Sequence, residues 1–253
     1  MKKLAIFDLD GTLAESKAPL DDGVGKWLDR LLGVCRVAVI SGGAWPQFQK
    51  QLLAHLPGSP DHLKRLSLLP TSGTRFLIYD DGKWRQLYAE DFTPEQRVKI
   101  TKALNDVFQA SGFVPPRHWG EVIEDRGSQI TLSALGQQAP LDQKKQWDPD
   151  FHKRSQMKAK LEQLLPEFSI GLGGSSSIDV TRPGVDKAYG IGKLQEVLGI
   201  KISEMVYVGD ALFEGGNDYP ARRTGATCIQ VAGPPETRKV IEAIVAWQGE
   251  APA

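Results

Sequence analysis

Two carboxylates near the start of the chain have the spacing of a cation site. Asp8 and Asp10 follow the apolar run Leu4 to Phe7, which is typical of a buried parallel strand. Because side chains alternate along a strand, both carboxylates leave its end pointing the same way. Mg²⁺ suits such a pair, since it takes hard oxygen ligands and is commonly held by one or two carboxylates and a substrate phosphate. The alternative interpretation is a strand followed by an ordinary Asp-Gly turn.

A second candidate site follows the next expected strand, Arg36 to Ile40. The stretch Ser41-Gly42-Gly43 ends that strand, and a helix with Pro46 in its first turn begins directly after it. A hydroxyl and backbone N–H groups at a helix N-terminus favour an anion, so Ser41 and Gly42 are candidate phosphate ligands. A plain strand-to-helix loop of the same composition is the alternative.

Charged residues recur at comparable positions in the C-terminal part of the chain. Lys187 begins a helix, where its ammonium can balance the charge of a nearby carboxylate such as Asp8. The strand Met205 to Val208 runs into Asp210, and the loop that follows contains Asp218. Placed near Asp8, these two carboxylates would complete a metal site, one binding the ion directly and the other through water. The sequence leaves open which of the two binds the ion directly. The alternatives are a surface lysine and a flexible turn.

The elements that position these residues follow two patterns. Residues 1–84 and 185–253 alternate apolar strands with amphipathic helices, which predicts an α/β core with a doubly wound, Rossmann-like parallel sheet and a site at the carboxyl ends of its strands. Residues 85–184 follow the order αββαββ, which predicts an inserted α+β cap domain with an antiparallel sheet. Three of the candidate residues lie at core strand ends: Asp8, Ser41 and Asp210.

Periodicity and turn residues also predict individual elements. In the core, a helix capped by Asp21 or Asp22 ends at Gly33, and another helix closes at Gly199. Further strands are expected at 66–69 and 228–231, a hairpin at 76–79 and 84–88, and a last helix at 235–247.

Four strands and two helices are expected in the cap. The strands span 121–124, 129–135, 168–172 and 177–181. A capping box at Thr93 opens a helix that bears Val98 among its apolar residues, and Asp148 caps a second helix that contains Leu164.

Composition narrows the class of partner. In 253 residues, Lys+Arg and Asp+Glu each total 31, so neither nucleic acid nor an anionic membrane is an expected partner. A small polar substrate fits better. The chain shows no apolar run of about 18 residues and no signal-peptide pattern, from which we expect a cytoplasmic protein. Cys35 and Cys228 lack CxxC spacing and are expected to be core thiols.

The segment FDLDGT resembles the first motif, D-x-D-G-T, of the haloacid dehalogenase superfamily of phosphotransferases. The resemblance implies that Asp8 is a nucleophile that forms an aspartyl-phosphate and that Asp10 is a general acid and base. It implies that Mg²⁺ is held by Asp8 and the backbone carbonyl of Asp10. Ser41 would donate a hydrogen bond to the transferring phosphoryl group, and Lys187 would be the lysine of the third motif.

Within that superfamily, the cap most resembles that of eukaryotic-type phosphomannomutases, and the similarity runs along nearly the whole chain. The matching segments are VISGGAWPQFQKQL, ITLSALGQQAP, GGSSSIDVTRPGVDKAYG and VGDALFEGGNDY. The resemblance implies that Arg126, Ser177 and Asp179 hold the sugar and its distal phosphate. Related mutases pair through their caps, so it also implies a homodimer.

Three arginines of that family are replaced here by Lys17, Gln137 and Lys144. Arginine binds phosphate through two parallel hydrogen bonds, which neither lysine nor glutamine reproduces, so the distal phosphate site is expected to be weaker, with Lys144 as a remaining ligand. We therefore place a phosphatase acting on a phosphorylated sugar or similar metabolite first. A phosphomannomutase is the alternative. A non-catalytic binding protein with the same fold is a third interpretation, against which the intact Asp8 and Asp10 argue.

Overall fold

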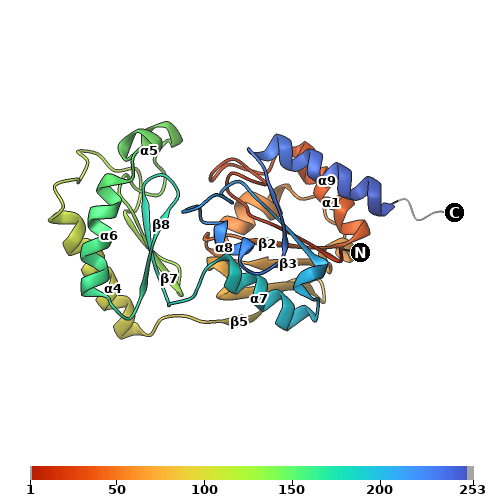
Figure 1. Ribbon diagram of the computed structural model, residues 1–253, viewed down its shortest axis with the longest axis horizontal. Helices are drawn as coiled ribbons and strands as arrows, with labels where there is room; N and C mark the ends of the chain where they lie inside the picture. The colour runs from red at the N-terminus through yellow and green to blue at the C-terminus, as the bar shows by residue number, and fades with distance from the viewer. Residues whose placement is uncertain (1, 250–253) are drawn as a thin grey trace. The chain divides into compact units, whose positions relative to one another are not determined.

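The computed structural model describes residues 2–249, which form two compact units (Figure 1). The core unit joins the chain up to Ala89 with the chain from Asp186 onward. The cap unit is the inserted segment Glu90–Val185. The α/β core with an inserted α+β unit is the predicted fold class.

A mostly parallel sheet forms the centre of the core unit. Its strands are β1 (Leu4–Phe7), β2 (Arg36–Ile40), β3 (Leu66–Leu69), β4 (Arg75–Asp80), β5 (Lys83–Ala89), β10 (Met205–Gly209) and β11 (Thr227–Gln230). Within the described residues they lie in the order β11-β10-β1-β2-β3-β4-β5. Strands β11 to β3 are parallel, whereas β4 and β5 pair antiparallel at one edge. Because this hairpin belongs to the core sheet, the first core segment extends to Ala89 and not only to residue 84.

Helices cover both faces of this sheet (Figure 1). The longer core helices are α1 (Asp22–Val34), α7 (Lys187–Leu198) and α9 (Pro234–Gly249); the short ones are α2 (Trp45–Gln47), the π-helix η1 (Phe48–Leu52), η2 (Leu53–His55), α3 (Pro60–Leu63), η3 (Thr71–Gly73), η4 (Ile202–Glu204) and α8 (Tyr219–Arg222). Alternate residues of β1 face opposite layers: Ala5 and Phe7 pack in the cluster with α1 and α9, and Leu4 and Ile6 in the cluster with α7 and α8. Both faces of β1 are therefore buried, which explains its continuous apolar sequence.

The ends of two core helices test the predicted caps. The Asp21 side chain accepts hydrogen bonds from the backbone of Gly23 and Val24 at 2.8 and 3.3 Å, so it is the N-cap of α1. The expected end at Gly33 is wrong, because α1 continues to Val34 and stops where the backbone becomes extended. Helix α7 closes at Gly199, whose φ of 66° is the left-handed conformation expected of a terminal glycine.

The cap unit packs its helices on one face of an antiparallel sheet (Figure 1). Its strands are β6 (Ile123–Asp125), β7 (Gln129–Ser133), β8 (Ser169–Gly173) and β9 (Ser177–Thr181), in the order β6-β7-β9-β8. Its helices are α4 (Pro94–Gln109), α5 (Leu141–Trp147) and α6 (His152–Leu164). Ile130 and Ile178 point into the apolar cluster with α4 and α6, so the alternate residues of β7 and β9 form the opposite, polar face.

Three features of the cap were not anticipated from the sequence. Helix α5 was not predicted, because its sequence LDQKKQW has too few apolar residues to show a periodicity. Val98 is 70% exposed, since α4 instead buries Ile100 and Leu104, which lie on another side of the helix. Leu164, in the last turn of α6, is 52% exposed.

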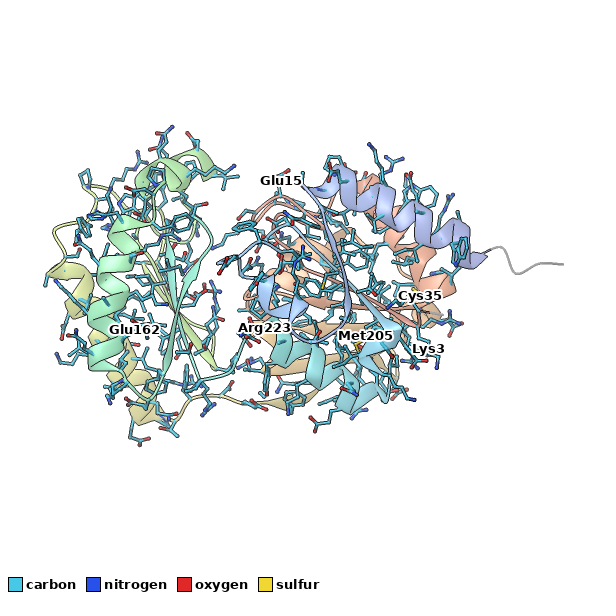
Figure 2. The ribbon with its side chains drawn as sticks, in the orientation of Figure 1. Lys3, Glu15, Cys35, Glu162, Met205 and Arg223 are labelled. Carbon is cyan, nitrogen blue, oxygen red and sulfur yellow. The ribbon has the colours of Figure 1, made fainter. Side chains whose placement is uncertain are left out.

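Buried side chains fill both units, and Figure 2 places the labelled Cys35 and Met205 inside the core unit. Cys35 and Cys228 are free thiols, as expected. Burial raises the pKa of the Cys35 thiol to about 11, which keeps it protonated and unreactive. Within residues 2–249, no helix combines the length and apolar content that a bilayer crossing requires.

A buried ion pair in the cap leads to a prediction about stability. The Arg154 guanidinium donates to Asp148 at 2.7 Å and to the carbonyl groups of Gly173 and Gly174 at 3.2 and 2.8 Å. Asp148 also accepts a hydrogen bond from the backbone N–H of Lys153 in the first turn of α6, as expected of a capping residue. The residue that directly precedes the helix is Phe151. We expect Asp148→Ala to lower the free energy of unfolding by about 3–5 kcal/mol, because it leaves a buried charge unpaired.

Urea unfolding followed by circular dichroism would measure this effect. The control is Asp106→Ala, which removes the acid of an exposed pair with Lys102 and should cost less than about 1 kcal/mol. Equal losses in the two variants would contradict the assignment of a structural role to the buried pair.

Candidate active site

Three neighbouring strands bring the predicted polar residues to the carboxyl-terminal end of the core sheet. Asp8 follows β1, and the order β10-β1-β2 places the ends of the two flanking strands beside it. Asp210 follows β10 and Ser41 follows β2. The structure therefore brings these three residues together, as expected from the carboxyl ends of parallel strands.

Asp8 and Lys187 form a buried ion pair at the centre of this end of the sheet. Asp8 is 3% exposed and Lys187 is 2% exposed. The Lys187 ammonium donates to Asp8 Oδ1 and, at 2.6 Å, to the carbonyl of Ile40. Lys187 is the first residue of α7, and Asp186 fixes that helix end by accepting from Tyr189 N at 3.0 Å. The helix start thus determines where the ammonium lies.

Asp210 and Asp218 complete an acidic cluster with Asp8. Each of the three residues offers a carboxylate oxygen, and these oxygens lie within 4.8 Å of one another. Thr12 fixes Asp210, because its hydroxyl donates to Asp210 Oδ1 at 3.2 Å and accepts from Asp210 N at 3.0 Å. Tyr207 donates to Asp218 Oδ1 at 2.5 Å. Both supporting contacts hold a carboxylate oriented towards the cluster.

The charge balance of this cluster fits a bound cation. Three carboxylates face the single Lys187 ammonium among the described residues, which leaves a surplus of negative charge. Burial raises the pKa of Asp8 to about 8; Lys187 works against this shift, while Asp218 adds to it. Burial and Asp218 also raise the pKa of Asp210. Burial disfavours the charged Lys187, but Asp8 and Asp218 outweigh it and raise its pKa. A divalent ion would supply the positive charge that the carboxylates require.

The Asp10 side chain is not part of the acidic cluster. Its carboxylate accepts hydrogen bonds from Gln47 Nε2 at 2.7 Å, from Gln51 Nε2 at 3.0 Å and from the backbone N of Lys17 at 2.6 Å. Of the predicted metal ligands Asp8, Asp10, Asp210 and Asp218, Asp10 therefore has its carboxylate engaged elsewhere, and its role in metal binding stays a prediction about its backbone carbonyl.

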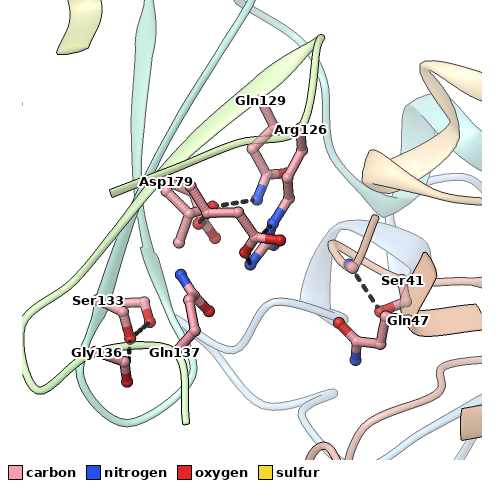
Figure 3. Close-up of polar contacts among 12 residues, drawn as sticks. Ser41, Gln47, Arg126, Gln129, Ser133, Gly136, Gln137 and Asp179 are labelled. Carbon is pink, nitrogen blue, oxygen red and sulfur yellow. Dashed lines mark hydrogen bonds and ion pairs between the residues drawn. The ribbon is translucent and has the colours of Figure 1, made fainter. Parts of the chain in front are cut away.

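Ser41 lies at the site with its hydroxyl directed to the following turn. The Oγ atom accepts from Gly43 N at 3.1 Å, as Figure 3 shows beside Gln47. The expected helix after this turn is short: α2 has three residues and passes directly into η1. The helix-dipole contribution to anion binding is therefore smaller than expected, and the hydroxyl of Ser41 and the backbone of Gly42 remain the candidate donors.

Arg126 and Asp179, two of the predicted substrate residues of the cap, lie in and beside its polar sheet face (Figure 3). Thr131 pairs with both Glu124 and Asp179 across the sheet and donates to Asp179 Oδ1 at 2.7 Å. Arg126 donates to Glu124 Oε2 through Nε and Nη2 at 2.9 and 2.6 Å. Ser177 donates to Ser133 at 3.3 Å. Asp179, Arg126 and Ser177 therefore stand among polar neighbours that can recognise hydroxyl groups.

Lys144 lies in α5, the helix that was not predicted. It is 9% exposed, and its ammonium donates to the carbonyl of Gln137 at 3.0 Å. This contact supports the backbone at Gln137. Its expected role as a phosphate ligand stays a prediction.

Several residues of the site were not identified from the sequence. Gln47 and Gln51 have the spacing of one helix face, but that spacing does not reveal that they face Asp10. Thr12 is part of the D-x-D-G-T motif, which could have indicated it. Tyr207 reads as an ordinary apolar residue of β10, and its contact with Asp218 follows from the loop after that strand.

Known proteins match most of the chain. A family model described as eukaryotic phosphomannomutase matches residues 98–247. The phosphomannomutase of Encephalitozoon cuniculi is 26% identical over 257 aligned positions, which cover 96% of this chain and 94% of that protein. The phosphomannomutase of Saccharomyces cerevisiae is 27% identical, with 94% of this chain and 92% of that protein covered.

Solved structures share the fold. An IMP-nucleotidase of Plasmodium falciparum matches with a TM-score of 0.70 at 17% identity, covering 96% of this chain and 70% of that chain. A haloacid dehalogenase-like hydrolase from Bacteroides thetaiotaomicron matches with a TM-score of 0.60 at 14% identity, covering 96% and 100%.

The fold, the acidic cluster and the matching family model together indicate a phosphotransferase with a haloacid dehalogenase-like fold. The family model covers more than half of the chain, and the relatives align along nearly all of it. The chain belongs to the eukaryotic phosphomannomutase family. The resemblance seen in the sequence is thereby confirmed.

Cation binding at the acidic cluster is expected to strengthen with pH. Without a cation, the pKa of Asp8 is about 8, whereas the ordinary value for Asp is 3.8. Ionisation of Asp8 therefore lowers the stability of the fold progressively as the pH rises from about 4 to 8. A divalent ion needs the ionised carboxylate, and its binding therefore releases a proton below pH 8. Titration calorimetry should show the apparent affinity for Mg²⁺ rising by up to about tenfold from pH 6 to 7.

The control is Asp8→Asn, which removes the titrating group and should flatten this dependence. An affinity of the unaltered protein that is constant from pH 6 to 8 would contradict the prediction.

Proposed function

We propose that the protein catalyses Mg²⁺-dependent phosphoryl transfer on a phosphorylated sugar or similar small metabolite, through an aspartyl-phosphate at Asp8. The observation that carries this proposal is the position of Asp8, where the acidic cluster and the buried Lys187 meet. A carboxylate held beside an ammonium and a bound cation can approach a phosphate dianion without prohibitive repulsion. Family membership supports the same chemistry.

Each residue then has a role in two half-reactions. An oxygen of Asp8 bonds to phosphorus as the bond from phosphorus to the leaving oxygen breaks, and Asp10 gives its proton to that oxygen. Asp10 next takes a proton from water or a sugar hydroxyl, whose oxygen attacks phosphorus and breaks the bond to Asp8. Lys187 and Ser41 stabilise the charge on the phosphoryl oxygens. Asp8, Asp210 and Asp218 are the candidate ligands of Mg²⁺, which would supply positive charge to offset the carboxylates and the phosphoryl oxygens.

Asp8→Asn should abolish turnover, because the amide has nearly the same shape but is a far weaker nucleophile. Phosphate release and sugar isomerisation would be measured on a panel of sugar phosphates and on p-nitrophenyl phosphate, with and without Mg²⁺. Asp81→Asn, in the exposed turn between β4 and β5, is the matched control and should keep full activity. Unchanged activity in Asp8→Asn would refute the nucleophile.

The first candidate for the overall reaction is the interconversion of mannose 1-phosphate and mannose 6-phosphate. The matching family model and the curated relatives support this phosphomannomutase activity more strongly than the phosphatase that the sequence placed first. A mutase must retain a bisphosphorylated intermediate and present either phosphate to Asp8. Its cap therefore needs a site for the second phosphate.

Phosphatase activity on a sugar phosphate remains the second candidate because of the charges in the cap. Glu124 binds the guanidinium of Arg126 through two hydrogen bonds, and Asp179 adds another negative charge to the same polar face. Together with Lys17, Gln137 and Lys144 in place of family arginines, this arrangement favours the hydroxyl groups of a sugar over a second phosphate. An intermediate that is held less tightly leaves more Asp8-phosphate to react with water.

Glu124→Gln is expected to shift the products towards isomerisation, because it removes the charge that competes with phosphate for Arg126. Mannose 1-phosphate would be supplied with a trace of hexose 1,6-bisphosphate, and mannose 6-phosphate and free phosphate would be quantified together. In the unaltered protein we expect isomerisation to exceed phosphate release. In Glu124→Gln we expect the ratio of isomerisation to phosphate release to rise about tenfold, which is the size of effect that one charged hydrogen bond produces.

Glu121→Gln makes the same change at an exposed position just before β6 and should leave the product ratio unaltered. An unchanged ratio in Glu124→Gln would show that Arg126 does not hold a second phosphate. Phosphate release without isomerisation in the unaltered protein would identify a phosphatase.

A further inference from the structure

We propose that Gln47 and Gln51 set the orientation of the Asp10 carboxylate, with Gln51 as a fixed anchor and Gln47 as a contact that the substrate displaces. The inference rests on the proposed function, in which Asp10 gives its proton to the leaving oxygen. Both glutamines act through Asp10, so they are positioning residues and not catalytic residues.

Both oxygens of Asp10 are held. Oδ1 accepts from Lys17 N at 2.6 Å and from Gln51 Nε2 at 3.0 Å, and Oδ2 accepts from Gln47 Nε2 at 2.7 Å. An ionised carboxylate only accepts hydrogen bonds, so each glutamine must direct its amide N–H groups at Asp10. Rotation of the carboxylate about its own axis would break all three contacts.

The two glutamines also hold each other. Gln47 Nε2 donates a second hydrogen bond to Gln51 Oε1 at 2.9 Å, and Gln51 Nε2 reaches the carbonyl of Glu15 at 3.4 Å. Each amide nitrogen therefore uses both of its N–H groups. A polar network in which every donor has a partner has one preferred arrangement and is rigid.

The local backbone is shaped for this network. Gln51 lies in the π-helix η1, where Leu53 N–H reaches back to the carbonyl of Phe48, a rare geometry that is common at functional sites. Leu20 N donates to the carbonyl of Gln51 at 2.8 Å and thereby ties this turn to the loop that follows Asp10. A Cβ atom at Gly43 would lie 2.5 Å from Gln47 Oε1, so a larger residue there would require the Gln47 side chain to move.

Burial separates the roles of the two glutamines. Gln51 is 3% exposed, whereas Gln47 is only half-buried. The contacts to Oδ1 come from a backbone amide and a buried side chain, which cannot move without disturbing the fold. The contact to Oδ2 comes from a more accessible side chain. Oδ2 is therefore the oxygen that can exchange its glutamine partner for the leaving-group oxygen, while Oδ1 keeps the carboxylate in place.

Gln51→Met tests the anchor, because methionine preserves the length of the side chain and removes the N–H donor. For sugar phosphates, whose leaving oxygen needs a proton, we expect kcat to fall about 10- to 100-fold with KM unchanged. For p-nitrophenyl phosphate, whose leaving group departs readily without protonation, kcat should change by less than about threefold. Gln47→Met should show the same selectivity with a smaller loss.

The matched control is Gln49→Met, the same substitution at an exposed position of η1, which should leave both substrates unaffected. An equal loss on both substrates in Gln51→Met would overturn the inference, because a damaged fold or nucleophile acts on every substrate. Full activity of Gln51→Met on sugar phosphates would also overturn it. Failure of the proposed function is a separate result: the unaltered protein would then show no turnover that depends on Asp8.

Discussion

The buried contact between Asp8 and Lys187 is the interaction on which the rest of the site depends. An isolated charge in this position would be strongly disfavoured, because burial removes the water that stabilises it. The pair exists because the end of β1 and the start of α7, far apart in sequence, meet beside the carbonyl of Ile40. The fold thereby places the positive charge of Lys187 among the carboxylates of the site. Removal of either partner would leave the other as an uncompensated buried charge.

Close approach of the backbone makes the acidic cluster possible. Gly11 has a φ of +85°, and a Cβ atom there would lie 2.7 Å from Asp210 Oδ2. A Cβ atom at Gly209 would lie 2.4 Å from Asp218 Oδ2. The two glycines therefore allow carboxylates to sit directly against the main chain. The glycine in D-x-D-G-T is thus a requirement of the site and not only of a turn.

The sequence predicted the elements with strong periodicity and the residues at their ends. Strands β1, β2 and β3 have the predicted bounds, because runs buried on both faces are predominantly apolar. Asp8, Ser41 and Asp210 could be assigned to one site because strand ends meet by topology. Contacts made by long side chains across elements could not be predicted in this way. The partner of Gln51 depends on a π-helical turn that no local pattern indicates, and Lys144 was assigned to substrate without knowledge of α5.

The two junctions between the core and cap units lie next to different elements of the core. One follows Ala89, at the end of the edge strand β5. The other precedes Asp186, which caps α7 immediately before Lys187. A change of chain length at the first junction alters the end of an edge strand, whereas one at the second displaces the helix start that places the ammonium beside Asp8. Evolution of new specificities by lengthening or exchanging the inserted segment is therefore constrained asymmetrically. A change of chain length after Ala89 therefore disturbs the catalytic charges less than one at Asp186.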